Sequence, residues 1–195
     1  PGSEQCEFEG KIYAGYKESP LSWEKGTKPE PIAWYAGRQY DADTAHAKEV
    51  LKNLDKYYPG ARGYEIAGFV FWQGHKDQNP AHASRYEQNL VNFIKSLRRD
   101  FDAPEAKFVL ATIGFEGDKL AGPGLVVAEA QLAVDGNRGK YPEFKGNVAT
   151  IDARPFWRAK EVSPSGAGYH YNHNAETYME VGTALGRAMA GLLKK

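Results

Sequence analysis

The sequence lacks the residues that would tie the chain to a disulfide framework, a zinc site or a membrane. Cys6 is the single cysteine among 195 residues, so an internal disulfide is excluded. Zinc sites built on paired cysteines are excluded with it. No apolar run approaches the roughly 18 residues that a membrane-spanning helix needs. We therefore expect a globular domain that is held together by its hydrophobic core.

An excess of charge of either sign is also lacking. The chain has 25 Lys and Arg against 25 Asp and Glu, so the formal net charge is zero with neutral histidines. A surface for nucleic acid or another polyanion is therefore not expected. Aromatic residues are plentiful instead, at 13% with 12 Tyr and 4 Trp. This share is found in proteins that handle sugars or other flat polar ligands, but a large core uses the same residues and is the favoured explanation.

The hydrophobic pattern alternates between helix-like and strand-like segments. Short apolar runs predict buried strands at 65–72, 107–114 and 147–152. Helical spacing predicts helices at 43–58, 81–101, 125–134 and 174–193. Such alternation is typical of an α/β domain with a parallel sheet. Residues 1–41 show no clean period, and we expect an irregular surface segment there, followed by one α/β domain at 42–195.

The first predicted strand ends in a polar turn. Its apolar residues run up to Trp72 and are followed by Gln73, Gly74, His75 and Lys76. In open α/β sheets ligands bind just beyond the carboxyl ends of the strands. A glycine there lets a backbone N–H approach a ligand closely, as an oxyanion hole requires. The turn is therefore a candidate site, although an exposed surface loop would explain His75 equally well.

His170 is the strongest candidate for a general base. It lies in a glycine-rich loop that leads into the last helix, where a side chain can meet a ligand. A structural histidine that hydrogen-bonds within the loop is an equal alternative. A metal site on His170 and His173 is not favoured, since no third ligand stands at suitable spacing. His46 and His82 are given no role, and no serine stands in a G-x-S-x-G turn.

Several blocks of the chain resemble one known family. Gly68–Asp77 (GFVFWQGHKD) is similar to a strand-end motif of the sialate O-acetylesterase-like branch of the SGNH hydrolases, which includes carbohydrate acetylesterases such as acetylxylan esterases. Further similar blocks are the helix at 85–98, the strand at 108–114, Ala128–Gln131 and the histidine block at 169–189. The ordered set covers the chain from about residue 42 to its end.

The resemblance implies a flavodoxin-like three-layer α/β/α fold and hydrolysis of acetyl esters on carbohydrates by a serine hydrolase without a cofactor or a metal. It assigns His170 as the general base, and Gln73, Gly74, His75 and Lys76 to the oxyanion and substrate-binding shell. Because its members act on polymeric sugars, it also implies a secreted or periplasmic location.

Three departures from the family pattern matter. The Gly-Gln-Ser-Asn-like turn that carries the nucleophilic serine does not occur, Ala167 stands where an acid commonly precedes the histidine, and Lys76 stands where many SGNH enzymes have an asparagine. We therefore expect a C-terminal portion whose first strands and nucleophile come from a segment outside it, or from a complementary N-terminal chain. Asp152 is one acid that could orient His170. A non-catalytic glycan-binding or structural subunit is the alternative function, and a lipase-like enzyme a weaker one.

Overall fold

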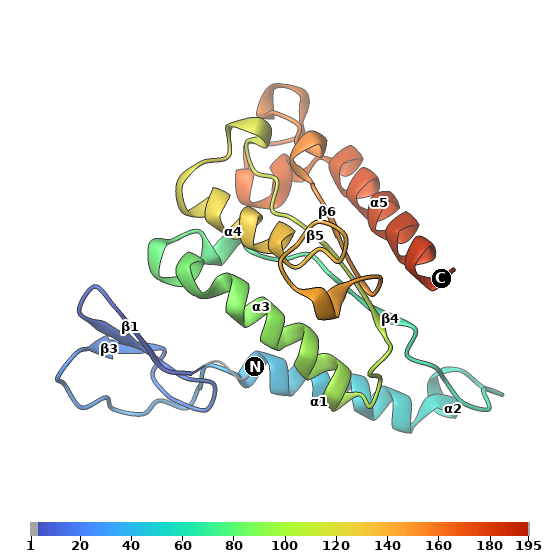
Figure 1. Cartoon of the computed structure of the whole chain (residues 1–195), viewed down its shortest axis with the longest axis horizontal. Coiled ribbons are helices and arrows are strands. Elements are labelled where there is room, and N and C mark those ends of the chain that lie inside the picture. The colour runs from blue at the N-terminus through green and yellow to red at the C-terminus, as the bar shows by residue number, and fades with distance from the viewer. Residues whose placement is uncertain (1–3, 195) are drawn as a thin grey trace. The chain divides into compact units, whose positions relative to one another are not determined.

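The computed structural model describes residues 4–194 and divides into two compact units (Figure 1). The first unit runs through Ile66 and also takes in Asn92–Pro104. The second comprises Ala67–Val91 and the chain from Glu105 onward. The long helix α3 (Pro80–Asp100) contributes residues to both units.

The first unit begins with a small antiparallel sheet where we expected an irregular segment. Its strands are β1 (Cys6–Phe8), β2 (Lys11–Tyr13) and β3 (Ser22–Glu24), in the order β1-β2-β3. The turn between β1 and β2 consists of Glu9 and Gly10, which both have positive φ, as tight hairpin turns require. Strands of three residues are too short to show an alternating pattern, so they could not be predicted from hydrophobic periodicity. The domain boundary between residues 41 and 42 stays a prediction.

The predicted helix at 43–58 is two helices in the structure, α1 (Arg38–Lys52) and α2 (Leu54–Tyr57). The break falls at Asn53, whose side-chain amide donates a hydrogen bond of 2.9 Å to the carbonyl oxygen of Glu49. An asparagine that bonds the backbone in this way competes with the helical pattern. The same Glu49 carbonyl oxygen also accepts the backbone N–H of Asn53 at 3.1 Å, so helix α1 ends where the side chain and the backbone share one acceptor.

Asp41 of α1 links this helix to the segments that precede it in the first unit. Its carboxylate accepts hydrogen bonds from the hydroxyl of Tyr16, from the hydroxyl of Tyr35 at 2.5 Å and from the Lys17 ammonium at 2.6 Å. Because the hydrogen bond from Lys17, followed by those from the two tyrosines, favours the charged form, the pKa of Asp41 is lowered to about 2. One carboxylate thus holds residues 16–41 together.

The second unit is built on a parallel three-stranded sheet, as the sequence predicted. Its strands are β4 (Gly68–Phe71), β5 (Lys107–Ala111) and β6 (Val148–Ile151), in the order β4-β5-β6. In this register Phe71 lies beside Leu110, and Ala111 lies beside Ile151. All three strands therefore end at one edge of the sheet.

Burial in the sheet differs from the prediction at β4. The central strand β5 is inaccessible to solvent from Phe108 to Ala111, whereas the Val70 side chain of β4 is 63% exposed. We predicted a strand buried on both faces, and that was wrong. Within residues 4–194 β4 pairs with β5 alone, so it is an edge strand of the described sheet.

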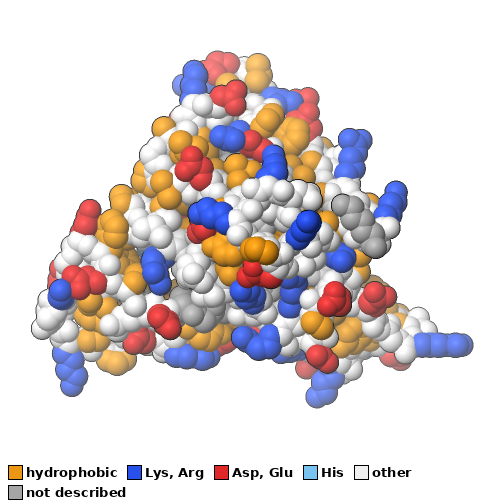
Figure 2. Space-filling view, viewed as in Figure 1, with side chains coloured by type: hydrophobic (Ala, Val, Ile, Leu, Met, Phe, Trp, Pro, Cys, Tyr) orange, Lys and Arg blue, Asp and Glu red, His pale blue; other side chains and the backbone are white. Residues whose placement is uncertain are grey.

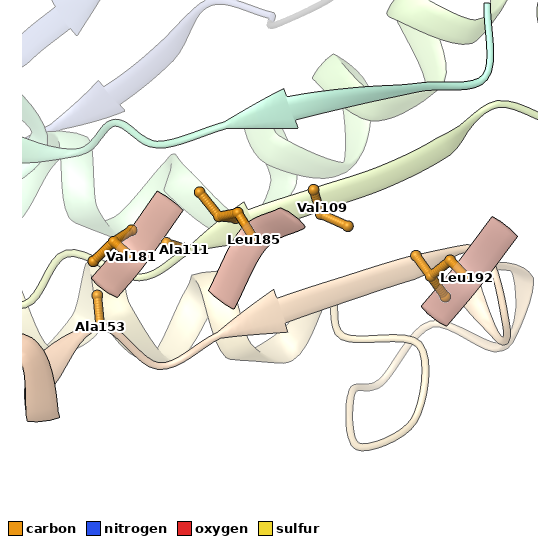
Figure 3. Close-up of a cluster of buried hydrophobic side chains, with 6 residues drawn as sticks. All are labelled: Val109, Ala111, Ala153, Val181, Leu185 and Leu192. Carbon is orange, nitrogen blue, oxygen red and sulfur yellow. The ribbon is translucent and has the colours of Figure 1, made fainter. Parts of the chain in front are cut away.

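Helices lie on both sides of the sheet, so the predicted α/β class is confirmed. Figure 1 shows α4 (Gly122–Ala133) and α5 (Ala175–Leu193) on opposite sides of the strands. Figure 3 shows Val181, Leu185 and Leu192 of α5 beside side chains of β5 and the residue Ala153. This cluster buries the apolar stripe that the spacing in the last helix had predicted.

The surface agrees with the balanced composition. On the face seen in Figure 2, Lys and Arg side chains are interspersed with Asp and Glu side chains. Across residues 4–194, no helix combines the length and the apolarity that crossing a bilayer requires.

Candidate functional site

Side-chain hydrogen bonds join the carboxyl ends of the three parallel strands. The indole N–H of Trp72, just after β4, donates to the carbonyl oxygen of Thr112 at 3.1 Å. The Thr112 hydroxyl oxygen, just after β5, accepts the N–H of Ala153 at 2.9 Å. These bonds make the edge where ligands bind in such sheets a fixed platform.

Gly74 takes a backbone conformation and a position that a side chain would not permit. Its φ is +149°, in a region that favours glycine. A Cβ atom at this position would lie 2.7 Å from Cγ2 of Ile113. The residue is buried, and its N–H donates no hydrogen bond to any of residues 4–194. The turn therefore holds an uncommitted N–H at the end of β4.

A fully buried glutamine of α4 fixes this turn from behind. Oε1 of Gln131 accepts the N–H of Ile113 at 2.8 Å. Nε2 of Gln131 donates to the carbonyl oxygen of Gln73 at 2.7 Å and to the Tyr86 hydroxyl at 3.0 Å. The Tyr86 hydroxyl in turn donates to the same Gln73 carbonyl at 3.0 Å. The side-chain amide of Gln131 thus connects the ends of β4 and β5 with helix α3.

The loop that carries His170 is the short 3-10 helix η6 (Gly168–His173), which turns into a left-handed stretch. Tyr171, Asn172 and His173 have φ values of 49°, 54° and 56°. Residues other than glycine adopt this conformation at a cost in free energy, and they cluster at functional sites. The loop is therefore held in an uncommon shape by its contacts.

Tyr171 supplies the main contacts that hold the loop. Its ring stacks on Phe115 with centroids 4.6 Å apart and lies 4.7 Å from the Trp72 ring. Its hydroxyl oxygen accepts the N–H of Gly114 at 3.3 Å. Burial raises the pKa of Tyr171 to about 12, so the phenol is neutral at physiological pH. The histidine loop is thereby packed against the ends of β4 and β5.

Two of the candidate histidines lie against one tyrosine. The Tyr169 ring is 5.7 Å from the His75 ring and 4.4 Å from the His170 ring. The His170 side chain is exposed, and its carbonyl oxygen accepts the Tyr178 hydroxyl at 3.0 Å. The structure thus brings the turn after β4 and the histidine loop to the same place. The role of His170 stays a prediction.

His173 is engaged differently from His170. Its Nδ1 atom lies 2.8 Å from the Ser165 hydroxyl oxygen, and its ring stacks on that of His170 at 5.4 Å. The Ser165 oxygen also accepts the N–H of Ala167 at 3.2 Å. The hydrogen bond between Ser165 and His173 therefore joins two parts of the same loop.

Two further residues that the sequence suggested, Lys76 and Asp152, make no contact with the His170 side chain among the described interactions. Lys76 is exposed in the short helix η1 (His75–Asp77). The Asp152 carboxylate accepts hydrogen bonds from the Arg154 guanidinium, the shortest of them from Nε at 2.9 Å and from Nη2 at 2.6 Å, and also from the backbone N–H of Arg154. The hydrogen bond from Arg154 lowers the pKa of Asp152. Asp152 is committed to Arg154, and no hydrogen bond joins it to His170 among the described residues.

A cavity of about 960 Å³ opens beside this edge of the second unit. Its wall includes His75, Tyr169 and Asn172, together with the aromatic residues Phe115 and Trp157. An aromatic wall with a few polar groups is typical of a small-molecule site. The candidate histidine loop and the turn after β4 therefore border a space large enough for a sugar ring.

Sequence reasoning missed Gln131 and Tyr171 as parts of the site. Gln131 stands in a mostly apolar helix whose other polar side chain is Glu129, and a polar residue among such apolar neighbours is the one signal that points to it. Tyr171 follows His170 directly, but a stacking partner 56 positions away cannot be read from its neighbours.

Comparison with protein families gives a match over residues 19–191 to the family described as carbohydrate esterase, sialic acid-specific acetylesterase. The match spans most of the chain and includes the turn after β4, Gln131 and the histidine loop. The chain belongs to this carbohydrate esterase family. The resemblance that the sequence motifs indicated is thereby confirmed.

A solved structure supports the fold. A protein from Arabidopsis thaliana, determined by X-ray crystallography, aligns with a TM-score of 0.51 at 24% sequence identity. The alignment covers 78% of this chain and 51% of the Arabidopsis protein, so the chain spans about half of that protein's length. No curated protein sequence matches the chain significantly.

Proposed function

We propose that this chain supplies the general base and the oxyanion and substrate-binding residues of a serine esterase that removes acetyl groups from carbohydrates. The observation that carries the proposal is that the rings of His75 and His170 both contact the Tyr169 ring, and that His75 follows Gly74, whose N–H donates no hydrogen bond to any of residues 4–194. Family membership supports the same reaction. We further propose export from the cytoplasm, where polymeric carbohydrate is met.

Each group has a defined task in acyl transfer. A serine hydroxyl attacks the acetyl carbonyl, and His170 accepts the hydroxyl proton as the bond forms. The N–H of Gly74 donates to the oxygen that becomes negatively charged, with Gln73, His75 and Lys76 around it. His170 then returns the proton to the sugar oxygen as the carbon–oxygen bond breaks. Water repeats the cycle and releases acetate.

The nucleophilic serine is proposed to come from a segment outside these 195 residues, in the same polypeptide or in a complementary chain. Ser165 is the serine next to a loop histidine, but it hydrogen-bonds His173, and its oxygen also accepts the N–H of Ala167. The exposed edge of β4, with Val70 open to solvent, offers a place for a further strand.

The test is hydrolysis of p-nitrophenyl acetate by the full-length protein and its His170→Ala variant. Loss of the general base is expected to lower kcat by about 10³-fold. His173→Ala is the matched control, since it removes the neighbouring ring of the same loop, and His46→Ala removes an exposed ring of α1. An unchanged rate in His170→Ala would remove this residue from the mechanism.

A non-catalytic glycan-binding subunit is the second candidate. Lys76 and Ala167 favour it, because both depart from the usual esterase pattern. Measuring glycan binding and ester hydrolysis on the same full-length protein distinguishes the esterase from the binding subunit. Full-length protein that binds a glycan but hydrolyses neither p-nitrophenyl acetate nor acetylated sugars would establish the binding function.

A further inference from the structure

The peptide group between Gln73 and Gly74 carries both a carbonyl oxygen with two bound donors and the N–H that is left uncommitted. The bond between the two residues is trans. In a planar trans peptide the C=O and the N–H point in opposite directions. The side chains that fix the Gln73 carbonyl therefore also fix the direction of the Gly74 N–H, which points away from them.

Two buried side chains supply the donors. Nε2 of Gln131 lies 2.7 Å from the Gln73 carbonyl oxygen, and the hydroxyl oxygen of Tyr86 lies 3.0 Å from it. Gln131 is fully buried and Tyr86 is only 7% exposed, so water does not compete for these hydrogen bonds. Burial raises the pKa of Tyr86, which keeps its hydroxyl protonated and able to donate.

A third hydrogen bond connects the two donors to each other. Nε2 of Gln131 also donates to the Tyr86 hydroxyl oxygen at 3.0 Å, while Oε1 of Gln131 accepts the N–H of Ile113 at 2.8 Å. Each polar atom of the amide is engaged, and only one orientation of the amide satisfies these partners. A hydroxyl that accepts one hydrogen bond donates more strongly in another. The bonds from Gln131 and Tyr86 therefore reinforce each other at the Gln73 carbonyl.

Hydrogen bonds to the carbonyl oxygen also change the N–H at the other side of the same peptide. The peptide unit is conjugated, so donors at its oxygen draw electron density from its nitrogen. The N–H becomes a stronger donor, as in cooperative chains of hydrogen bonds. An oxyanion hole needs such a donor in place before the negative charge develops. The two bonds thus contribute to the strength of the Gly74 N–H as well as to its direction.

The surroundings of Gly74 keep the peptide from turning over. Glycine permits more backbone rotation than any other residue. A Cβ atom built on Gly74 would lie 2.7 Å from Cγ2 of Ile113 and 3.1 Å from Cγ1 of Val127. It would also lie 3.4 Å from Nε2 of Gln131. Close packing against α4 and the end of β5 therefore adds to the hydrogen bonds.

The side chain of Gln73 is engaged at both ends. Its Oε1 atom lies 3.2 Å from the Tyr86 hydroxyl oxygen, and its Nε2 atom donates to Oδ2 of Asp77 at 2.7 Å. The Gln73 side chain therefore braces the turn after β4, and its backbone carbonyl receives the two buried donors.

We propose that Gln131 and Tyr86 are positioning residues of the esterase, which hold and polarise the peptide before Gly74 so that its N–H binds the oxyanion. The inference rests on the proposed function and adds two residues that touch neither the substrate nor the reacting atoms. Their contribution arises when the negative charge forms in the transition state, and not when the substrate binds.

The test is steady-state hydrolysis of p-nitrophenyl acetate by the full-length protein. Tyr86→Phe removes the hydroxyl alone and is expected to lower kcat about tenfold, with KM within about twofold. Gln131→Met removes the other donor and is expected to lower kcat about 100-fold, measured where circular dichroism shows a folded protein. Tyr141→Phe is the matched control, because the Tyr141 hydroxyl donates to Glu87 of the same helix α3. It should keep kcat within about twofold.

A spectroscopic measurement on the same proteins reads the peptide directly. Gln73–Gly74 is the one Gln–Gly step in these 195 residues. Isotope labelling of the glutamine carbonyl carbon and the glycine nitrogen therefore isolates the nuclear magnetic resonance signal of this peptide within them. Tyr86→Phe should move the carbonyl resonance of Gln73 and the amide resonance of Gly74 upfield, whereas Tyr141→Phe should move neither.

An unchanged kcat in Tyr86→Phe would overturn the inference, whatever the resonances show. A rise in KM at unchanged kcat would overturn it as well, because it would show a role in substrate binding. If the unaltered full-length protein does not hydrolyse the ester, it is the proposed function that fails. Resonances of the peptide that move upfield in Tyr86→Phe would then support the inference, and resonances that stay in place would overturn it.

Discussion

Gln131 and Gln73 are joined by a hydrogen bond of 2.7 Å, from Nε2 of the first to the backbone carbonyl oxygen of the second, although they are 58 positions apart in the sequence. The same Gln131 amide accepts the N–H of Ile113. One buried side chain therefore sets the relative position of the ends of β4 and β5. The N–H of Gly74 follows Gln73 directly, so its direction depends on this bond.

Replacing Gln131 by methionine is expected to lower the free energy of unfolding by about 2–4 kcal/mol, because it leaves the buried N–H of Ile113 without an acceptor at nearly unchanged side-chain volume. Urea denaturation measures this change. Gln39→Met is the matched control on the exposed surface of α1, with an expected effect within about 0.5 kcal/mol. Equal small effects at both positions would contradict a structural role for the buried amide.

Gly74→Ala tests the turn itself. The new methyl group would lie 2.7 Å from Cγ2 of Ile113 and the residue would keep a φ of +149°, so we expect a loss of at least about 2 kcal/mol in unfolding free energy. Gly146→Ala is the control, since Gly146 also has a positive φ of 73° but a Cβ there would meet nothing within 4 Å. The difference between the two variants isolates the steric contact, and no difference would argue against close packing at Gly74.

Much of the second unit could be predicted because its elements are long or strongly patterned. Helix α3 spans Pro80–Asp100 close to the predicted range, and α5 begins after the capping residue Asn174, whose side chain accepts the N–H of Thr177. Helix α4 begins three residues earlier than predicted, at Gly122, because a proline at the first turn is compatible with a helix start. The exposure of Val70 could not be predicted, since it depends on which strands lie beside β4 and not on β4 itself.

The site could be predicted only in part, and for a similar reason. A parallel sheet places the ends of its strands at one edge, so the sequence could indicate the turn after β4 as a site. It could not indicate that the ring of Tyr169, the neighbour of His170, lies against His75, because a ring contact across 94 positions depends on the path of the loops. Nor could it show that Asp152 is committed to Arg154.

Asp41→Asn is expected to destabilise the first unit in a pH-dependent manner. The pKa of Asp41 is lowered to about 2 from an ordinary value of 3.8, so the folded state favours the ionised carboxylate. Its contribution is therefore present above about pH 4 and is lost as the pH falls toward 2. Urea denaturation of the unaltered protein and of Asp41→Asn between pH 7 and pH 2 measures the difference in their unfolding free energies. This difference should become smaller as the pH falls from about 4 toward 2. A difference in unfolding free energy that stays constant down to pH 2 would contradict the role of the Asp41 charge. Asp43→Asn is the control, because it removes the charge of another acid of α1.

Val70→Lys tests whether the exposed edge of β4 is covered in the full-length protein. If a further strand and its helix pack against this residue, burying the ammonium group should cost about 2 kcal/mol or more in unfolding free energy. If the residue stays as exposed as it is here, at 63%, the substitution should change the free energy by less than about 0.5 kcal/mol. Val126→Lys, on α4 and 44% exposed, is the matched control. A neutral result at Val70 would remove this edge as the place where a segment carrying the nucleophile pairs, whereas a large loss at Val70 with none at Val126 would support it.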